Sequence, residues 1–164
     1  MTQKPQYNDQ QMPNTYTQVH LQFVFAPKYR ASLILSSWEN DLYKYITGIV
    51  QNNNHKMITI NGMPDHVHML VGFRSTQSMA DLMQDVKAGS SKWINDNKYC
   101  KGRFEWQSGY GAFSYAKSQL PNVIRYIENQ KEHHNRKTFL EEYKLFLEKF
   151  EVEYDEKYIF REPE

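Results

Sequence analysis

The chain has 164 residues, of which 15% are aromatic and 24% are charged, and its formal net charge is +1. This length fits one domain with a substantial hydrophobic core, and the sequence contains no apolar run long enough for a membrane helix. No signal-peptide pattern opens the sequence and the single cysteine, Cys100, excludes an internal disulfide, so we expect a cytoplasmic protein.

Charge is distributed unevenly along the sequence. Residues 1–137 hold 16 Lys and Arg against 10 Asp and Glu, whereas residues 138–164 hold 4 against 9. A mildly basic body can attract a polyanion such as nucleic acid, although an excess of this size is also common in proteins that bind none. We expect a flexible arm at 1–14, one domain at 15–150 and an acidic tail at 151–164.

Apolar periodicity predicts the secondary structure in chain order. Period-two alternation and β-branched runs predict strands at 17–25, 56–61, 66–73, 104–107 and 109–115. Three- and four-residue spacing predicts helices at about 38–50, 78–94, 118–134 and 138–150. Serine side chains are expected to cap the first and third helices, from Ser36 or Ser37 and from Ser118, and the second helix is expected to open at Gln77 and Ser78. We expect His55 to be solvated in a loop.

This order of elements predicts the fold class. A strand, a helix, two strands, a helix and a further strand form the β-α-β-β-α-β order of a ferredoxin-like α+β sheet, here with appended C-terminal helices. In such an antiparallel sheet the strand at 66–73 is central. Two helices cover one face, and we expect the other face to be free.

Two histidines separated by one residue lie in this central strand. His66 and His68 share one face of the strand, because Val67, Met69 and Val71 occupy the other. Two imidazoles that project in the same direction from a rigid strand can chelate one metal ion. The alternative is that one histidine is a hydrogen-bonded core residue and the other is incidental.

Further candidates come from the basic and aromatic residues. Lys28 and Arg30 follow the first strand, and Lys87 and Lys92 lie on the second helix among serine and aromatic residues. These cations either contact nucleic-acid phosphates or form solvated surfaces.

On the third helix, Tyr126 and Gln130 are four residues apart and share one flank. Taken alone, a tyrosine beside an apolar stripe is most often a packing residue.

Several of these segments together resemble the IS200/IS605 family of single-tyrosine HUH transposases. The matching segments are NGMPDHVH at 61–68, GYGAFS at 109–114 and YIENQKEHH at 126–134, supported by KYR at 28–30 and SSKW at 90–93. They occur in the order and spacing of the family, and the resemblance covers about residues 15–150.

The resemblance implies a catalytic tyrosine at Tyr126 and a divalent metal, Mg²⁺ or Mn²⁺, bound by His66, His68 and Gln130. It also implies single-stranded DNA with hairpin ends as the partner, and a nucleoid-associated protein in a bacterium or archaeon. A homodimer is expected, in which the helix with Tyr126 packs near the histidines of the other subunit. Lys28, Arg30, Lys87 and Lys92 are our predicted phosphate contacts.

The expected activity is cleavage and rejoining of single-stranded DNA at element ends. A tyrosine hydroxyl that attacks phosphorus leaves a 5′-phosphotyrosine and a free 3′-OH, and this covalent intermediate conserves the energy of the broken bond. One alternative is a domesticated or inactive relative that binds hairpins or processes repeats. A metal-dependent hydrolase and an RNA-binding sheet are further alternatives.

Overall fold

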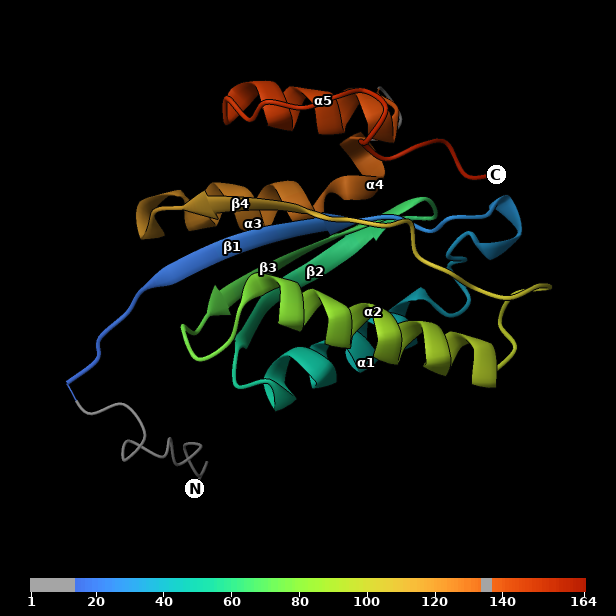
Figure 1. Ribbon diagram of the computed structural model, residues 1–164, viewed down its shortest axis with the longest axis horizontal. Helices are drawn as coiled ribbons and strands as arrows, with labels where there is room; N and C mark the ends of the chain where they lie inside the picture. Colours follow the sequence, from blue (N-terminus) through green and yellow to red (C-terminus); the bar gives the residue numbers. More distant parts are fainter. Residues whose placement is uncertain (1–13, 134–136) are drawn as a thin grey trace.

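The protein is described by a computed structural model that covers residues 14–133 and 137–164. Its centre is a four-stranded sheet in the order β2-β3-β1-β4, in which neighbouring strands are antiparallel. The strands are β1 (Val19–Phe25), β2 (Lys56–Met63), β3 (His66–Phe73) and β4 (Gly111–Tyr115). The predicted ferredoxin-like architecture is confirmed, with β3 in the interior of the sheet (Figure 1).

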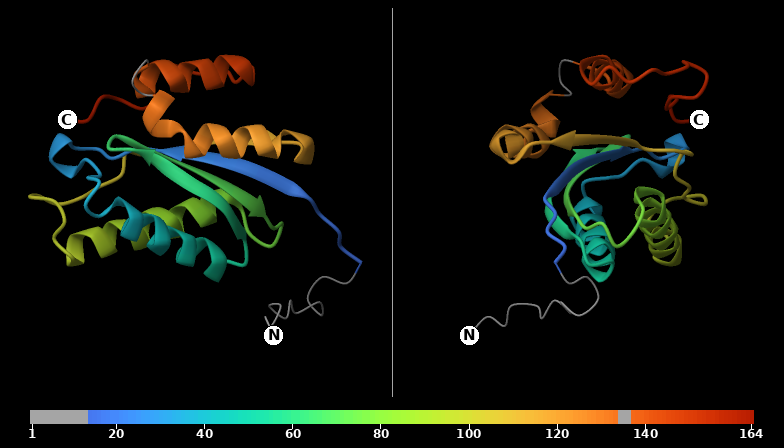
Figure 2. Two further views of the ribbon diagram at one scale, coloured as in Figure 1. Left: turned by 180° about the vertical axis from the view of Figure 1, so that it is seen from behind. Right: turned by 60° about the vertical axis from the view of Figure 1, so that its left-hand side comes forward.

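Helices lie over both faces of the sheet (Figures 1 and 2). One face is covered by α1 (Glu39–Asn52) and α2 (Met79–Asp96). Over the other face lie α3 (Leu120–Glu128), α4 (Gln130–His133) and α5 (Phe139–Lys149). Short 3-10 turns occur at η1 (Arg30–Ser32) and η2 (Lys117–Gln119). The prediction of a free second face is therefore wrong, because α3 and α5 also carry apolar side chains that become buried against the sheet.

The alternation of side chains along β1 and β3 divides the core between the two faces. Buried residues directed toward α1 and α2 are Leu21, Phe23, Phe25, Val67, Met69 and Val71. On the other face, Leu70 packs with Val123 and Ile127 of α3. Because the side chains alternate, the histidines of β3 point to the same face as Leu70 and lie beneath α3 and α5.

Residues 104–107, predicted as a strand, form an isolated bridge between Pro27 and Trp106 instead. Phe104 is buried, and the Trp106 ring packs edge-on against Phe25 with 4.8 Å between the ring centroids. These apolar side chains anchor a loop to the core. Phe104 and Trp106 alternate with polar residues because both pack on the core, while the segment forms only a single bridge, which explains why the pattern was misleading.

The helix predicted at 118–134 is divided into three elements. The 3-10 turn η2 precedes α3, so the predicted cap at Ser118 is wrong. Asn129 ends α3 with φ −96° and ψ 19°, and α4 begins at the next residue. His134, the last residue of the predicted helix, lies outside the described residues, as does the predicted arm up to residue 13.

The other predicted helix caps differ in outcome. α2 opens at Ser78 as predicted, and the structure adds that Ser78 is its cap, because the Ser78 side-chain oxygen accepts a hydrogen bond of 3.0 Å from the backbone N–H of Asp81. The prediction of Ser36 or Ser37 for α1 is wrong, since Trp38 occupies the cap position without a side-chain hydrogen bond.

None of the helices within the described residues combines the length and apolar character needed to span a membrane.

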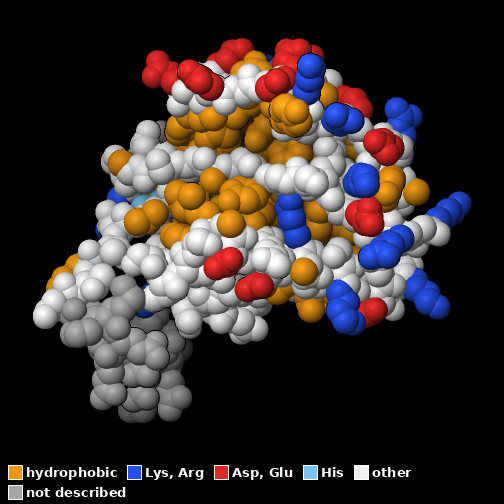
Figure 3. Space-filling model, viewed as in Figure 1, with side chains coloured by type: hydrophobic (Ala, Val, Ile, Leu, Met, Phe, Trp, Pro, Cys, Tyr) orange, Lys and Arg blue, Asp and Glu red, His pale blue; other side chains and the backbone are white. Residues whose placement is uncertain are grey.

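Charged side chains are unevenly distributed on the face shown in Figure 3. Asp and Glu gather over α5 and the C-terminal segment at the top of the view, whereas Lys and Arg gather where α2 ends. The C-terminal segment packs on the domain: Phe160 is buried against Phe139 and Tyr143. Its end pairs with the backbone after β1, because Arg30 N–H donates to the Glu164 carbonyl at 2.7 Å.

Candidate active site and metal centre

His66 and His68 lie side by side on β3, beneath the helices of the second face. Both side chains are completely buried, and their ring centroids are 5.1 Å apart with the planes at 84°. Two completely buried imidazoles require polar partners, because a buried group that can form hydrogen bonds costs free energy when it forms none. Apart from Asp65, which directly precedes His66, these partners come from segments distant in the sequence.

His66 has an oxygen atom of another side chain close to each ring nitrogen. Its Nδ1 lies 2.7 Å from Asp65 Oδ1, and its Nε2 lies 3.0 Å from Gln130 Oε1. The ring also stacks on Phe139 of α5, with 4.3 Å between centroids and 7° between planes. When the Asp65 carboxylate holds the proton on Nδ1, a neutral His66 has a lone pair and no donor at Nε2. Nε2 and Gln130 Oε1 then both present lone pairs that a metal ion could bind.

His68 is held between β1 and α5. The Gln22 amide nitrogen donates to His68 Nδ1 at 2.8 Å, and His68 Nε2 therefore carries the proton that it donates to Glu142 Oε1 at 2.7 Å. Gln22, itself completely buried, accepts from the Tyr115 hydroxyl at 2.7 Å. A chain of hydrogen bonds thus fixes the orientation of the second imidazole.

The donor atoms at this point suit a divalent metal ion. One ligand atom each from His66, His68 and Glu142 lie within 4.8 Å of one another. The Gln130 side-chain oxygen adjoins the same place through His66. Two imidazoles with carboxylate and amide oxygens form a mixed nitrogen and oxygen set that first-row divalent ions accept. The structure brings together the three predicted ligands and adds the carboxylate of α5.

Tyr126 lies over the histidines on α3. Its ring centroid is 6.0 Å from that of His68, with 88° between the planes. Burial, followed by the negative charge and hydrogen bond of Glu142, raises the pKa of the Tyr126 phenol above its ordinary value. The hydroxyl therefore remains protonated at neutral pH, and positive charge nearby would be required to favour the phenolate.

The position of Tyr126 depends on a side chain of β2. The Asn61 amide donates to the carbonyl oxygens of Ile127 and Glu128, at 3.0 Å each, where α3 ends. Lys131 of α4 donates to the Asn61 side-chain oxygen at 3.2 Å. Asn61 thus attaches the end of the tyrosine helix to the hairpin that carries the histidines.

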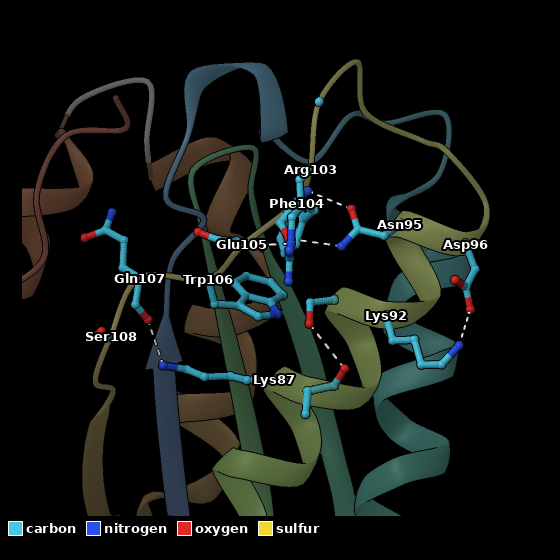
Figure 4. Close-up of a pocket in the computed structure, with 13 residues that line it drawn as sticks. Lys87, Lys92, Asn95, Asp96, Arg103, Phe104, Glu105, Trp106, Gln107 and Ser108 are labelled. Carbon is cyan, nitrogen blue, oxygen red and sulfur yellow. Dashed lines mark hydrogen bonds and ion pairs between the residues drawn. The ribbon is translucent and has the colours of Figure 1, made fainter.

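Two of the four predicted phosphate contacts lie on α2, on the opposite side of the sheet. Lys87 Nζ donates to the backbone carbonyls of Gln107 and Gly109, and burial lowers the pKa of Lys87 to about 8. Lys92 forms an ion pair with Asp96 (Figure 4). Both line a cavity of about 910 Å³ between α2 and the loop at 102–108. The structure therefore does not place them beside the histidines.

The other two predicted phosphate contacts follow β1. Lys28 Nζ lies 3.5 Å from the Glu105 carboxylate, and the Arg30 side chain donates to the Pro163 carbonyl at 3.2 Å. Each of these cations is thus partly engaged by an acidic side chain or by the C-terminal segment. Binding of a phosphate there would replace these internal partners.

The prediction that His55 is solvated is wrong, because only 4% of its surface is exposed. Its Nδ1 accepts from the Arg74 backbone N–H at 2.9 Å, and its Nε2 lies 2.9 Å from Gln77 Oε1. The ring also stacks on Phe73. His55 therefore ties the loop before β2 to the end of β3 and has a structural role.

Glu142, Gln22 and Asp65 were not identified from the sequence. Glu142 lies on the apolar face of its helix, where Phe139 and Tyr143 are buried, and a carboxylate on such a face indicates a partner inside the protein. Gln22 similarly interrupts the apolar run of β1. A polar residue at a position that the apolar pattern predicts to be buried was the sequence signal that could have identified Glu142 and Gln22.

Comparison with known proteins identifies the family. The sequence profile described as Transposase IS200 like matches residues 15–130, which is more than half of the chain. The chain belongs to the IS200-like transposase family. The matched segment includes the two histidines, Tyr126 and Gln130, whereas α5 with Glu142 lies beyond it.

Relatives of this IS200-like transposase include one curated protein and two solved structures. The chain is 23% identical over 118 residues to the ISDra2 transposase TnpA of Deinococcus radiodurans, an alignment that spans 69% of this chain and 84% of that protein. A Deinococcus radiodurans R1 structure described as a transposase aligns with a TM-score of 0.57 and 21% identity, over 71% of this chain and 94% of that one. A REP-associated tyrosine transposase bound to a REP hairpin aligns with a TM-score of 0.56 and 13% identity, over 73% of this chain and 71% of that one. At these identities the likeness to the solved structures establishes the fold.

Proposed function

We propose that this IS200-like transposase cleaves and rejoins single-stranded DNA through a 5′-phosphotyrosine on Tyr126, with the assistance of a divalent metal ion. The observation that carries the proposal is the convergence of Tyr126, the histidine pair and Gln130 at one buried point of a single chain. A packing tyrosine would not require two buried imidazoles and a buried amide beside it.

His66, His68 and Gln130 are the proposed metal ligands, with Glu142 adjoining them. The oxygen donors suit both Mg²⁺ and Mn²⁺, whereas the two imidazole nitrogens favour Mn²⁺, because Mg²⁺ is the harder cation and prefers oxygen ligands. A bound ion would neutralise negative charge that develops on the phosphate. It would also offset the effect of burial and of Glu142 on the Tyr126 phenol.

The proposed reaction is a transesterification. The Tyr126 oxygen attacks phosphorus, the bond between phosphorus and the 3′-oxygen breaks, and a bond between tyrosine and the 5′-phosphate forms. The phenol loses its proton, for which the hydrogen-bonded Glu142 carboxylate is placed as an acceptor, and the departing 3′-oxygen gains one. Attack by a 3′-OH on the phosphotyrosine reverses these steps and rejoins the strand.

We also propose that the DNA substrate carries hairpin ends and that Lys28, Arg30, Lys87 and Lys92 contact its phosphates. Lys92 is the least costly of these to engage, because its ion pair with Asp96 is on the surface and such pairs contribute about 0–1 kcal/mol. Lys87 would have to exchange two backbone carbonyls for a phosphate.

The proposal is tested by incubating the protein with labelled single strands from the DNA on either side of its gene, in Mn²⁺ or Mg²⁺. On a denaturing gel we expect a labelled band shifted by the mass of one 19.6 kDa chain. EDTA and Tyr126→Phe should abolish the band, whereas Tyr158→Phe should retain it because Tyr158 is 85% exposed and remote in sequence.

Other outcomes would identify the alternatives. Cleavage that produces no adduct and survives Tyr126→Phe would indicate a metal-dependent hydrolase. Hairpin binding without cleavage by the unmodified protein would indicate a relative that only holds its DNA.

A further inference from the structure

A cavity of about 590 Å³ lies between α3 and α5, on the same side of the sheet as the histidines. Tyr126 and Glu142 both line it. His66, His68 and Gln130 are completely buried. At this cavity, Tyr126 and Glu142, which contact the buried histidines, are accessible to a ligand.

The lining of this cavity combines aromatic surface with positive charge. Tyr115 of β4 and Phe146 of α5 contribute rings, and Lys137 and Lys149 contribute cations, against the single carboxylate of Glu142. Aromatic side chains stack on nucleobases irrespective of their identity, and lysines bind phosphates. The volume falls within the range of about 300–1,000 Å³ that is typical of sites for small organic ligands.

α5 supplies much of this lining, although it lies beyond residues 15–130 that match the family profile. Glu142, Leu145, Phe146 and Lys149 all project from α5 into the cavity. The helix is firmly packed, because Phe139, Tyr143 and Leu147 on its other positions are buried in the core. The cavity thus combines residues of β4 and α3, which lie within the range that matches the profile, with residues of α5, which lies beyond it.

We propose that this cavity binds one nucleotide of the single-stranded DNA substrate, with its base against Tyr115 and Phe146 and its phosphate between Tyr126 and the lysines. The inference rests on the proposed function, since it assigns the nucleotide whose phosphate Tyr126 attacks. Two lysines opposed by one carboxylate leave a net positive lining, which complements a phosphodiester. In this arrangement α5 is a wall of the substrate site.

The test fills the cavity or removes one of its cations. Leu145→Trp places a larger side chain at the cavity from a position that is 46% exposed, so the fold tolerates it. Its matched control is Leu35→Trp, because Leu35 is 53% exposed and does not line the cavity. Lys149→Ala is paired with Lys144→Ala, since Lys144 lies on the same helix and pairs with Glu156. Thermal unfolding establishes that each variant is folded.

Binding is measured by fluorescence anisotropy of the labelled flanking strands, with Tyr126→Phe added to every variant so that no covalent bond forms. We expect Leu145→Trp and Lys149→Ala to weaken binding at least tenfold, and the two controls to change it less than twofold. In proteins that retain Tyr126, the same two variants should lose most of the covalent adduct.

Unchanged or tighter binding by Leu145→Trp would overturn the inference. Increased adduct formation would also overturn it, because α5 would then be a cover that the DNA has to displace. The failure of the proposed function is distinguishable: no adduct would form with the unmodified protein, while the effect of the variants on binding would still be measured. If none of the strands binds, both proposals fail.

Discussion

The two ring nitrogens of His68 have different partners, and the proton position that these partners impose has to reverse before the nitrogen next to Glu142 can bind a metal ion. With the Gln22 amide nitrogen donating to Nδ1, the proton is on Nε2, which faces Glu142. Binding of an ion at Nε2 requires this proton to move to Nδ1. The Gln22 amide then has to turn over, so that its oxygen accepts from Nδ1 and its nitrogen donates to the Tyr115 oxygen. Gln22 is thus a positioning residue that suits both states.

We expect Gln22→Met to weaken Mn²⁺ binding about 10- to 100-fold, the usual cost of losing a partner that orients a metal-bound histidine. Methionine fills a similar volume but cannot form a hydrogen bond with His68 Nδ1. Isothermal titration with Mn²⁺ measures the change directly. Gln18→Met, at an exposed position before β1, should leave the affinity unchanged. An equal affinity for the two variants would show that Gln22 does not orient the histidine.

At the scale of single residues, the sequence was sufficient for groups whose spacing is local. The alternation of β3 places His66 and His68 on one face, and the structure brings Tyr126 and Gln130 to them. Glu142 could not be assigned because its contact with His68 spans 74 residues. No local pattern states which buried carboxylate meets which imidazole.

At the scale of elements, the hairpin of β2 and β3 holds its two strands in close contact at Gly62. A Cβ atom added at Gly62 would meet the carbonyl oxygen of His66 and lie 3.0 Å from Val67 Cα. Both are backbone atoms of the opposing strand, so neither can move without shifting the strand that carries the histidines. Glycine at this position permits the close approach of the two strands.

We therefore expect Gly62→Ala to lower the free energy of unfolding by about 1–3 kcal/mol, the usual range for overpacking. Gly48→Ala is the matched control, because a Cβ atom at Gly48 in α1 would meet nothing within 4 Å. That change should raise the free energy of unfolding by about 0.5–1 kcal/mol, since alanine favours a helix over glycine. Urea unfolding of both variants measures these changes. A Gly62→Ala protein with the same free energy of unfolding as the unmodified protein would contradict the prediction.

Elements were predictable where one periodic pattern decided them, as for β3, α2 and the order of the sheet. The division of the predicted helix at 118–134 was not predictable from its own residues. Its end at Asn129 is accompanied by contacts from Asn61 on β2, which binds the last carbonyls of α3. The second covered face was missed for a similar reason, because docking of α5 depends on tertiary contacts and not on its local sequence.

At the scale of the molecule, one chain contains the whole candidate site. α3 packs on β2 and β3 of its own chain, so that Tyr126 lies beside its own histidines. The family resemblance implied a homodimer in which this helix lies near the histidines of the other subunit, and that dimer remains a prediction. The two arrangements differ in which chain supplies the nucleophile.

Co-expression of differently tagged His68→Ala and Tyr126→Phe chains distinguishes the two arrangements. A site contained in one chain predicts that each variant alone, and the two together, form no adduct, because every chain would lack one part of its own site. Sites shared between subunits would instead pair an intact histidine pair with an intact Tyr126 in mixed dimers, and the adduct would return on the His68→Ala chain. Its tag identifies that chain on the gel.

The contact between His68 and Glu142 also bears on the order in which the protein folds. The hairpin of β2 and β3 closes a short loop, whereas the pairing of Gln22 with His68 spans 46 residues and that of His68 with Glu142 spans 74. Long loops close at a greater entropic cost, and contacts distant in sequence slow folding. Because synthesis runs from the N-terminus, the two histidines also leave the ribosome well before Glu142 of α5 has been synthesised. The complete set of reactive groups is assembled at a late stage, so an unfinished chain cannot carry the full site.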